Sequence, residues 1–121
     1  MKVLRIITRL NVGGPSFQVR SLMTGLAEEG FDQCLVAGST APGEQEVDFA
    51  DSLCPIRIRS LQRPLSPIQD WKALRELPSI IRDASPTLVH THMGKAGWIG
   101  RLAARRAGVP FIVHTYHGHT F

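Results

Sequence analysis

The stretch that decides the fold runs from Leu88 to Phe121 and reads LVHTHMGKAGWIGRLAARRAGVPFIVHTYHGHTF. Its pattern predicts a strand ending in His90-Thr91-His92, a helix of small residues from about Lys95, and a second strand leading to His117-Gly118-His119. The stretch holds all five histidines of the 121-residue chain. Histidine is the side chain that most readily changes its charge near neutral pH. We therefore expect the functional site in this strand–helix–strand unit.

The rest of the chain repeats this alternation of short apolar runs and amphipathic segments. Small residues line one side of the last predicted helix, which indicates a close approach of that helix to a sheet. Residues 38–54 show no periodicity and are expected to form a loop. The predicted strands are residues 2–8, 33–37, 56–61, 87–91 and 111–115, and the predicted helices are residues 15–29, 67–83 and 95–107.

Alternating strands and helices are typical of a parallel sheet covered by helices on both faces. We predict an α/β fold with a Rossmann-like sheet whose strands, numbered along the chain, take the order 3-2-1-4-5. The loops after strands one, four and five then meet where the strand order reverses. Ligands of open α/β sheets bind at this point, so a glycine loop and the histidines are expected to share one crevice.

The second predicted helix has three features that a structure can check. The sequence Ser66-Pro67-Ile68-Gln69 resembles a capping box, in which the serine caps the helix and the glutamine reaches back to it. Trp71, Leu74 and Leu77 are expected to form the buried stripe of the helix. Pro78 lacks an N–H donor and is expected to kink or restart the helix.

The composition is that of a globular protein with a formal net charge of +4 at pH 7. Such a charge fits a phosphate-bearing ligand, an anionic membrane or nucleic acid and selects none of them. Arg101, Arg105 and Arg106 form the one local basic cluster, which is more simply read as a solvated helix face. Cys34 and Cys54 are isolated thiols, so neither a disulfide framework nor a zinc–thiolate site is indicated. No signal peptide or membrane span is apparent, and a cytoplasmic setting is expected.

Gly13-Gly14-Pro15 opens the first predicted helix and is a candidate phosphate-binding loop. Backbone N–H groups at a helix N-terminus attract anions, so Gly13 and Gly14 are predicted to bind substrate. The motif matches neither GxGxxG nor the Walker loop. A plain tight turn explains the loop equally well when it is judged alone.

His90 and His92 lie two residues apart on a predicted strand and therefore face the same way. A metal site completed by a later histidine is one interpretation, but no Asp or Glu follows Asp83. Because such sites normally recruit a carboxylate, neither a metal ion nor another cofactor is expected. His90 and His114 fit hydrogen-bonded core histidines, whereas His92, nearer the strand end, is a predicted substrate contact.

Four further residues at the crevice are candidates for function. His117, just past the fifth strand, can donate a hydrogen bond or charge to a substrate oxygen and is the predicted catalytic residue. Gly118 lets the chain turn or a ligand come close, and His119 is a predicted substrate contact beside it. Lys95, at the start of a helix, fits a phosphate or carboxylate, although a solvent-exposed lysine is an equal alternative.

At these residues the chain resembles the N-terminal domain of family 4 glycosyltransferases, retaining enzymes of the GT-B fold. The resemblance covers the strand, glycine loop and helix of Arg5 to Gly30. It continues in Val89-His90-Thr91-His92, Lys95-Ala96-Gly97, Gly100-Arg101-Leu102-Ala103-Ala104, Gly108-Val109-Pro110 and His114-Thr115-Tyr116-His117-Gly118-His119. It implies transfer of a sugar from a nucleotide-diphosphate sugar to an acceptor, often a lipid-linked or envelope glycan, with retained anomeric configuration.

The resemblance also implies roles for particular residues. Gly13 and Gly14 would lie near the donor phosphates, His117 would contact the transferred sugar and assist catalysis, and no bound metal would be needed. The family's second Rossmann domain, with its paired glutamates, has no counterpart in residues 1–121. The family's N-terminal domain would continue past Phe121, so we expect a truncated N-terminal domain that cannot transfer sugar alone.

Two other functions compete with this one. The chain fits a non-catalytic Rossmann-like binding module or a remnant of an enzyme, and less well a hydrolase with a histidine-bound metal. The basic charge is compatible with peripheral contact at the inner face of a membrane. Nucleic acid is not expected as a partner.

Overall fold

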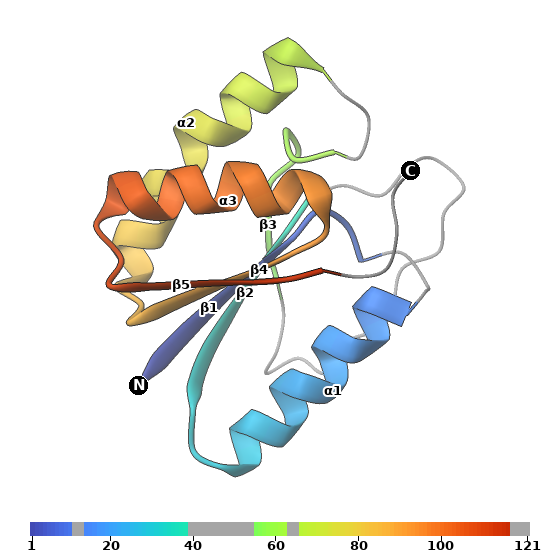
Figure 1. Cartoon of the computed structure of the whole chain (residues 1–121), viewed down its shortest axis with the longest axis vertical. Helices are drawn as coiled ribbons and strands as arrows, with labels where there is room; N and C mark the ends of the chain where they lie inside the picture. The colour runs from blue at the N-terminus through green and yellow to red at the C-terminus, as the bar shows by residue number, and fades with distance from the viewer. Residues whose placement is uncertain (11–13, 39–54, 63–65, 117–121) are drawn as a thin grey trace.

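The computed structural model describes residues 1–10, 14–38, 55–62 and 66–116. Five parallel strands form one sheet in the order β3-β2-β1-β4-β5. Helix α1 covers one face and helices α2 and α3 cover the other (Figure 1). The Rossmann-like fold and the strand order are confirmed. Along the chain the elements are β1 (Lys2–Ile7), α1 (Gly14–Glu28), β2 (Asp32–Ala37), β3 (Ile56–Arg57), α2 (Pro67–Ala84), β4 (Leu88–His92), α3 (Gly94–Ala107) and β5 (Phe111–Thr115).

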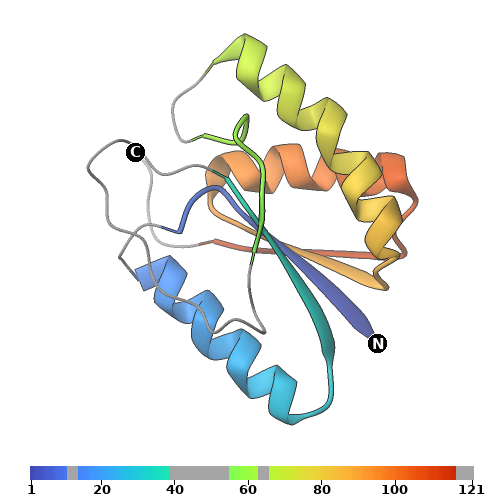
Figure 2. The same cartoon turned by 180° about the vertical axis from the view of Figure 1, so that it is seen from behind.

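The central strand β1 separates two hydrophobic cores, which lie between the sheet and the helices on its two faces. Figure 2 shows these layers from behind. Leu4 and Ile6 point into the larger core beneath α2 and α3, and Ile7 points into the smaller core beneath α1. A strand buried on both faces forms a nearly continuous apolar run in the sequence. This run, interrupted only by Arg5, is why the sequence identified β1. No helix in the described part of the chain has the length and apolar character that crossing a bilayer requires.

The start of α2 differs from the predicted capping box. Ser66 occupies the N-cap position, but its side chain makes no cap hydrogen bond. The carboxylate that reaches back belongs to Asp70, whose Oδ2 accepts the Ser66 N–H at 3.3 Å. The role assigned to Gln69 is therefore wrong. A shorter acidic side chain one residue later makes the contact, and a negative charge in the first turn also suits the helix dipole.

The buried stripe of α2 is rotated relative to the prediction. Ala73, Leu77 and Ile81 are buried, whereas Trp71 is 56% exposed, so its predicted burial is wrong. The helix also runs through Pro78 without restarting. Packing of its inner face against the core holds the two halves together across the missing hydrogen bond.

The strand predicted over residues 56–61 is much shorter in the structure. Strand β3 contains only Ile56 and Arg57, and the chain then turns. Ile58 and Leu61 are both buried, and the Leu61 N–H donates to the Ile58 carbonyl at 3.2 Å. The alternation of apolar and charged residues predicts a strand, but the buried pair, Ile58 and Leu61, is spaced three apart and belongs to a turn.

Helix α3 lies so close to the sheet that Gly100 has no room for a side chain. A Cβ there would stand 2.7 Å from Thr91 Cγ2 and 3.2 Å from Ile6 Cδ1. The predicted close approach is confirmed. We expect Gly100→Ala to lower the free energy of unfolding by about 1–3 kcal/mol, because neither branched neighbour can move away freely. Urea unfolding measures this.

Gly25, in the interior of α1, provides the matched control because a Cβ there would meet no atom within 4 Å. The same substitution at this site is expected to stabilise the chain by about 0.5–1 kcal/mol, since alanine favours the helix. Equal effects at both positions would contradict the close helix–sheet contact.

Candidate functional site

The candidate site lies at the carboxyl edge of the sheet, where β1, β4 and β5 end. Strand register places Ile7 beside His92, and His92 beside Thr115. Gly14 is the first residue of α1, and Lys95 lies in the first turn of α3. These ends neighbour one another because the strand order reverses between β1 and β4.

Four of the predicted site residues lie outside the described part of the chain, and their roles stay predictions. These are Gly13, His117, Gly118 and His119. The last three follow strand β5, whose final residue, Thr115, pairs with His92.

His90 in β4 and His114 in β5 each form a side-chain hydrogen bond with a threonine of the neighbouring strand. His90 Nε2 lies 2.5 Å from Thr115 Oγ1, and His114 Nδ1 lies 2.8 Å from Thr91 Oγ1. The hydrogen bonds expected for His90 and His114 are thus present, although both side chains are only half-buried. Within the ranges that the structure describes, no three His, Cys, Asp or Glu residues are grouped to hold a metal ion.

His92 ends β4 on the same face as His90. The two ring centroids are 4.1 Å apart, closer than the roughly 6–7 Å that separates such residues along a strand, so the rings lean toward each other. The His92 side chain is buried. A substrate contact at His92 therefore requires a ligand that reaches the buried end of β4.

Lys95 is held in an ion pair that sequence reasoning missed. Its Nζ lies 2.7 Å from Asp70 Oδ1, and both side chains are buried. The alternative of a solvent-exposed lysine is therefore wrong. The ion pair joins the first turn of α3 to the first turn of α2 at the edge of the site.

Thr8 fixes the start of α3 from the opposite side. Its Oγ1 accepts the Ala96 N–H at 3.1 Å and satisfies one of the unpaired donors at the helix N-terminus. Met93, between β4 and α3, has φ 71° and ψ 166°, a conformation that is essentially restricted to glycine. Backbone strain of this kind collects at functional sites and at sharp junctions. The strained residue separates His92 from the helix that carries Lys95.

Ser16 is a further candidate that the sequence did not single out. It lies in the first turn of α1, and its Oγ is buried without a hydrogen-bond partner among the described residues. A hydroxyl in this position can donate to an anion held at the helix N-terminus. The only signal in the sequence is its place two residues after Gly14.

A buried cation lies beneath the site on the α1 face. Arg5 is 2% exposed, and its guanidinium donates to Gln33 Oε1 at 2.5 Å. Burial lowers its pKa to about 10, so the side chain remains charged at neutral pH. In the strand register it lies beside His90. This buried positive charge favours an anionic ligand at the neighbouring site.

A parallel sheet covered by helices on both faces, with a glycine-opened helix where the strand order reverses, defines a Rossmann-like domain. Sucrose-phosphate synthase from Thermosynechococcus elongatus has a similar fold, with a TM-score of 0.69 and 21% identity over 98% of this chain and 33% of that one. A lipopolysaccharide outer core galactosyltransferase is similar with a TM-score of 0.68 and 15% identity, over 97% of this chain and 33% of that one.

The chain belongs to the glycosyl transferase 4-like domain family, whose model matches residues 13–121. It is 40% identical over 96 residues to an Escherichia coli enzyme, UDP-Gal:alpha-D-GlcNAc-diphosphoundecaprenol alpha-1,3-galactosyltransferase. That match covers 79% of this chain and 24% of the relative, so the chain spans about a quarter of the relative's length. The resemblance to family 4 glycosyltransferases is confirmed.

Proposed function

We propose that this domain is the acceptor-side part of a retaining glycosyltransferase of the hexosyltransferase type. The enzyme would move a sugar from a nucleotide-diphosphate sugar to a lipid-linked or envelope glycan. The observation that carries this proposal is the 40% identity with an enzyme named for a UDP-galactose donor and a diphosphoundecaprenol-linked acceptor. The anion-attracting helix ends and the buried Arg5 support it.

The start of α1 is proposed to bind the donor diphosphate. Gly13 and Gly14 would let the phosphates approach the backbone, and the Ser16 hydroxyl would add a donor that has no other hydrogen-bond partner in the described chain. Negative charge grows on the leaving diphosphate as the sugar departs. Donors already aimed at that charge stabilise the transition state without rearrangement.

The remaining predicted residues are proposed to bind the sugar and the acceptor. His117 would donate a hydrogen bond to the transferred sugar and assist catalysis, and Gly118 and His119 would shape the wall beside it. His92 and Lys95 would contact substrate from the β4–α3 junction, where Asp70 fixes the lysine. No metal or other cofactor is proposed.

The enzyme is proposed to be cytoplasmic and to contact the inner face of a membrane peripherally. A lipid-linked acceptor is confined to a bilayer, so contact with the bilayer would raise the encounter rate between enzyme and acceptor. Nucleic acid is not proposed as a partner.

A transfer assay tests the function. The intact mass of the polypeptide from the source cell first establishes the length of the native product. The native product is then purified and incubated with UDP-galactose and a GlcNAc-diphospholipid. We expect transfer by a product that includes a second Rossmann domain, and none by residues 1–121 alone. If a longer product with such a domain transfers no sugar from any common nucleotide-sugar, the proposal fails and the non-catalytic binding module replaces it.

A further inference from the structure

Arg5 is a buried cation for which the described residues supply no carboxylate. Its side chain is 2% exposed, its guanidinium donates to the neutral amide oxygen of Gln33, and its Nε has no hydrogen-bond partner. Burial alone lowers its pKa, without an offsetting contribution from a nearby charge. A buried charge that no opposite charge compensates is costly, and most buried charges in proteins are paired. The anion that Arg5 requires must therefore come from outside the described residues.

The guanidinium lies too far from the start of α1 to be neutralised by a ligand bound there. The Gln33 amide that accepts from Arg5 also donates to the Met23 carbonyl at 2.7 Å, so this contact lies beside Met23. Met23 follows Gly14 by nine positions, which corresponds to roughly 13–14 Å along the helix. Arg5 can attract an anionic ligand toward the site through its field, but direct pairing requires a different anion.

Half of the sheet beside Arg5 is uncovered on the same face. The core beneath α1 contains described side chains of α1, β1 and β2 but none of β4 or β5. Strand register places His90 beside Arg5 and Val113 beside His90, so these side chains share the α1 face. Phe111 and Val113 are 60% and 45% exposed there. The uncovered half therefore combines exposed apolar side chains on β5 with a buried cation at its border.

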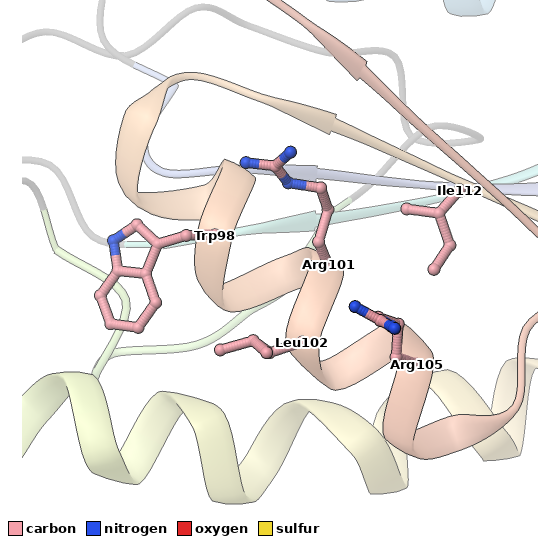
Figure 3. A pocket seen from close by; sticks show the side chains of 5 residues that line it. All are labelled: Trp98, Arg101, Leu102, Arg105 and Ile112. Atoms are coloured by element: carbon pink, nitrogen blue, oxygen red, sulfur yellow. The ribbon is translucent and has the colours of Figure 1, made fainter.

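The α3 face of β5 shows no such combination. Ile112 lies between the two exposed residues, points the opposite way and packs against the core beneath α3. On that side it lines a hollow of about 530 Å³ together with Trp98, Arg101, Leu102 and Arg105 (Figure 3). Arg101 and Arg105 are exposed, so water solvates their charges and neither requires a protein counter-ion. Arg105 is therefore a suitable control for Arg5.

We propose that a helix of the native product, formed by residues beyond Phe121, covers this half of the sheet and places a carboxylate against Arg5. The inference rests on the proposed function, in which the native product is longer than residues 1–121. The Escherichia coli relative has the necessary length, because the match covers 24% of it. A helix suits a sheet face, and its apolar side would bury Phe111 and Val113. In a symmetric dimer the same face would meet itself, which would place a cation rather than a carboxylate opposite Arg5.

The substitution Arg5→Met tests the proposal, because the sign of its effect differs between two polypeptides. Methionine keeps an unbranched apolar side chain and removes the charge. In residues 1–121 the change removes an uncompensated charge, so we expect Tm to rise by about 3–6 °C. In the native product it leaves a carboxylate buried without its partner, so the Tm of the transition that unfolds residues 1–121 should fall by about 5 °C or more. Arg105→Met, at an exposed arginine, is expected to shift either Tm by less than about 2 °C.

A scan in the native product identifies the carboxylate. Each Asp and Glu beyond Phe121 is replaced by alanine, with and without Arg5→Met. We expect one acid whose replacement lowers Tm when Arg5 is present and raises Tm in the Arg5→Met background. A scan without such a coupled acid would overturn the proposal. A fall of Tm with Arg5→Met in both polypeptides would also overturn it, because the counter-ion would then lie within residues 1–121.

Two further results would reject the proposal. A rise of Tm with Arg5→Met in both polypeptides would show that the native product supplies no carboxylate. A dimer of residues 1–121 in analytical ultracentrifugation that Arg5→Met dissociates would assign the uncovered face to a second copy. Sugar transfer is measured separately. A native product that transfers sugar but has no coupled acid keeps the proposed function and loses this inference, whereas an inactive product with a coupled acid does the reverse.

Discussion

Replacing Asp70 by alanine is expected to lower the free energy of unfolding by about 3–5 kcal/mol. The substitution leaves the Lys95 ammonium buried without the carboxylate that lies 2.7 Å away. It also removes the acceptor of the Ser66 N–H at the start of α2. An uncompensated buried charge is among the most destabilising changes that a single substitution produces.

A double substitution separates the effect of the unpaired charge on stability from the effect of lost packing. Asp70→Leu combined with Lys95→Met removes both charges and keeps apolar volume, so the double variant is expected to recover most of the lost stability. Urea unfolding of the unaltered chain, Asp70→Leu, Lys95→Met and the double variant, followed by circular dichroism, gives the four corners of this cycle. Trp71→Ala, at an exposed neighbour on α2, is expected to change stability by less than about 0.5 kcal/mol. If Asp70→Ala is as mild as Trp71→Ala, the ion pair does not join α2 to α3 in solution.

The elements that periodicity located best are those whose side chains meet the core in a regular way. Strand β1 is buried on both faces, and α3 packs small residues on the sheet, so both left a plain pattern in the sequence. Strand β3 is shorter than predicted because only Ile56 and Arg57 of the alternating run join the sheet, whereas the buried Ile58 and Leu61, three positions apart, belong to a turn. The stripe of α2 was misplaced because Trp71 was assumed to be buried, whereas it lies exposed, with the Arg75 guanidinium 4.8 Å from its ring.

Some features of the candidate site could be predicted from the sequence and others could not. The sheet edge at which the candidate site lies followed from topology, because strand order decides which strand ends are neighbours. The ion pair between Asp70 and Lys95 could not be predicted from topology, because the two residues are 25 positions apart and only the packing of α2 on α3 brings them together. The apolar run of residues 2–8 predicts a strand position for Thr8, whereas its hydrogen bond from the Ala96 N–H spans 88 positions and leaves no local pattern. Contacts between helix ends depend on tertiary geometry, which composition and spacing do not record.

Replacing His117 by alanine in the native product is expected to lower kcat by about 10²–10⁴-fold, the usual contribution of a positioned proton or hydrogen-bond donor. This expectation rests on the proposed glycosyl transfer. A group that acts on the transferred sugar stabilises charge that develops as the bond to the diphosphate breaks. Its removal should therefore lower kcat more than it raises KM for the nucleotide-sugar.

Two further variants decide what the histidine does. His117→Gln keeps a hydrogen-bond donor but cannot carry a positive charge, so partial activity would indicate hydrogen bonding, and activity as low as alanine's would indicate charge. His119→Ala, two positions away, is expected to raise KM with a smaller loss of kcat, because it is assigned to binding. Initial rates over a range of donor concentrations give both constants, and circular dichroism confirms that each variant is folded. An unchanged kcat in folded His117→Ala would remove this residue from catalysis. The search for the catalytic group would then move to the β4–α3 junction, where the strained Met93 separates His92 from the ion-paired Lys95.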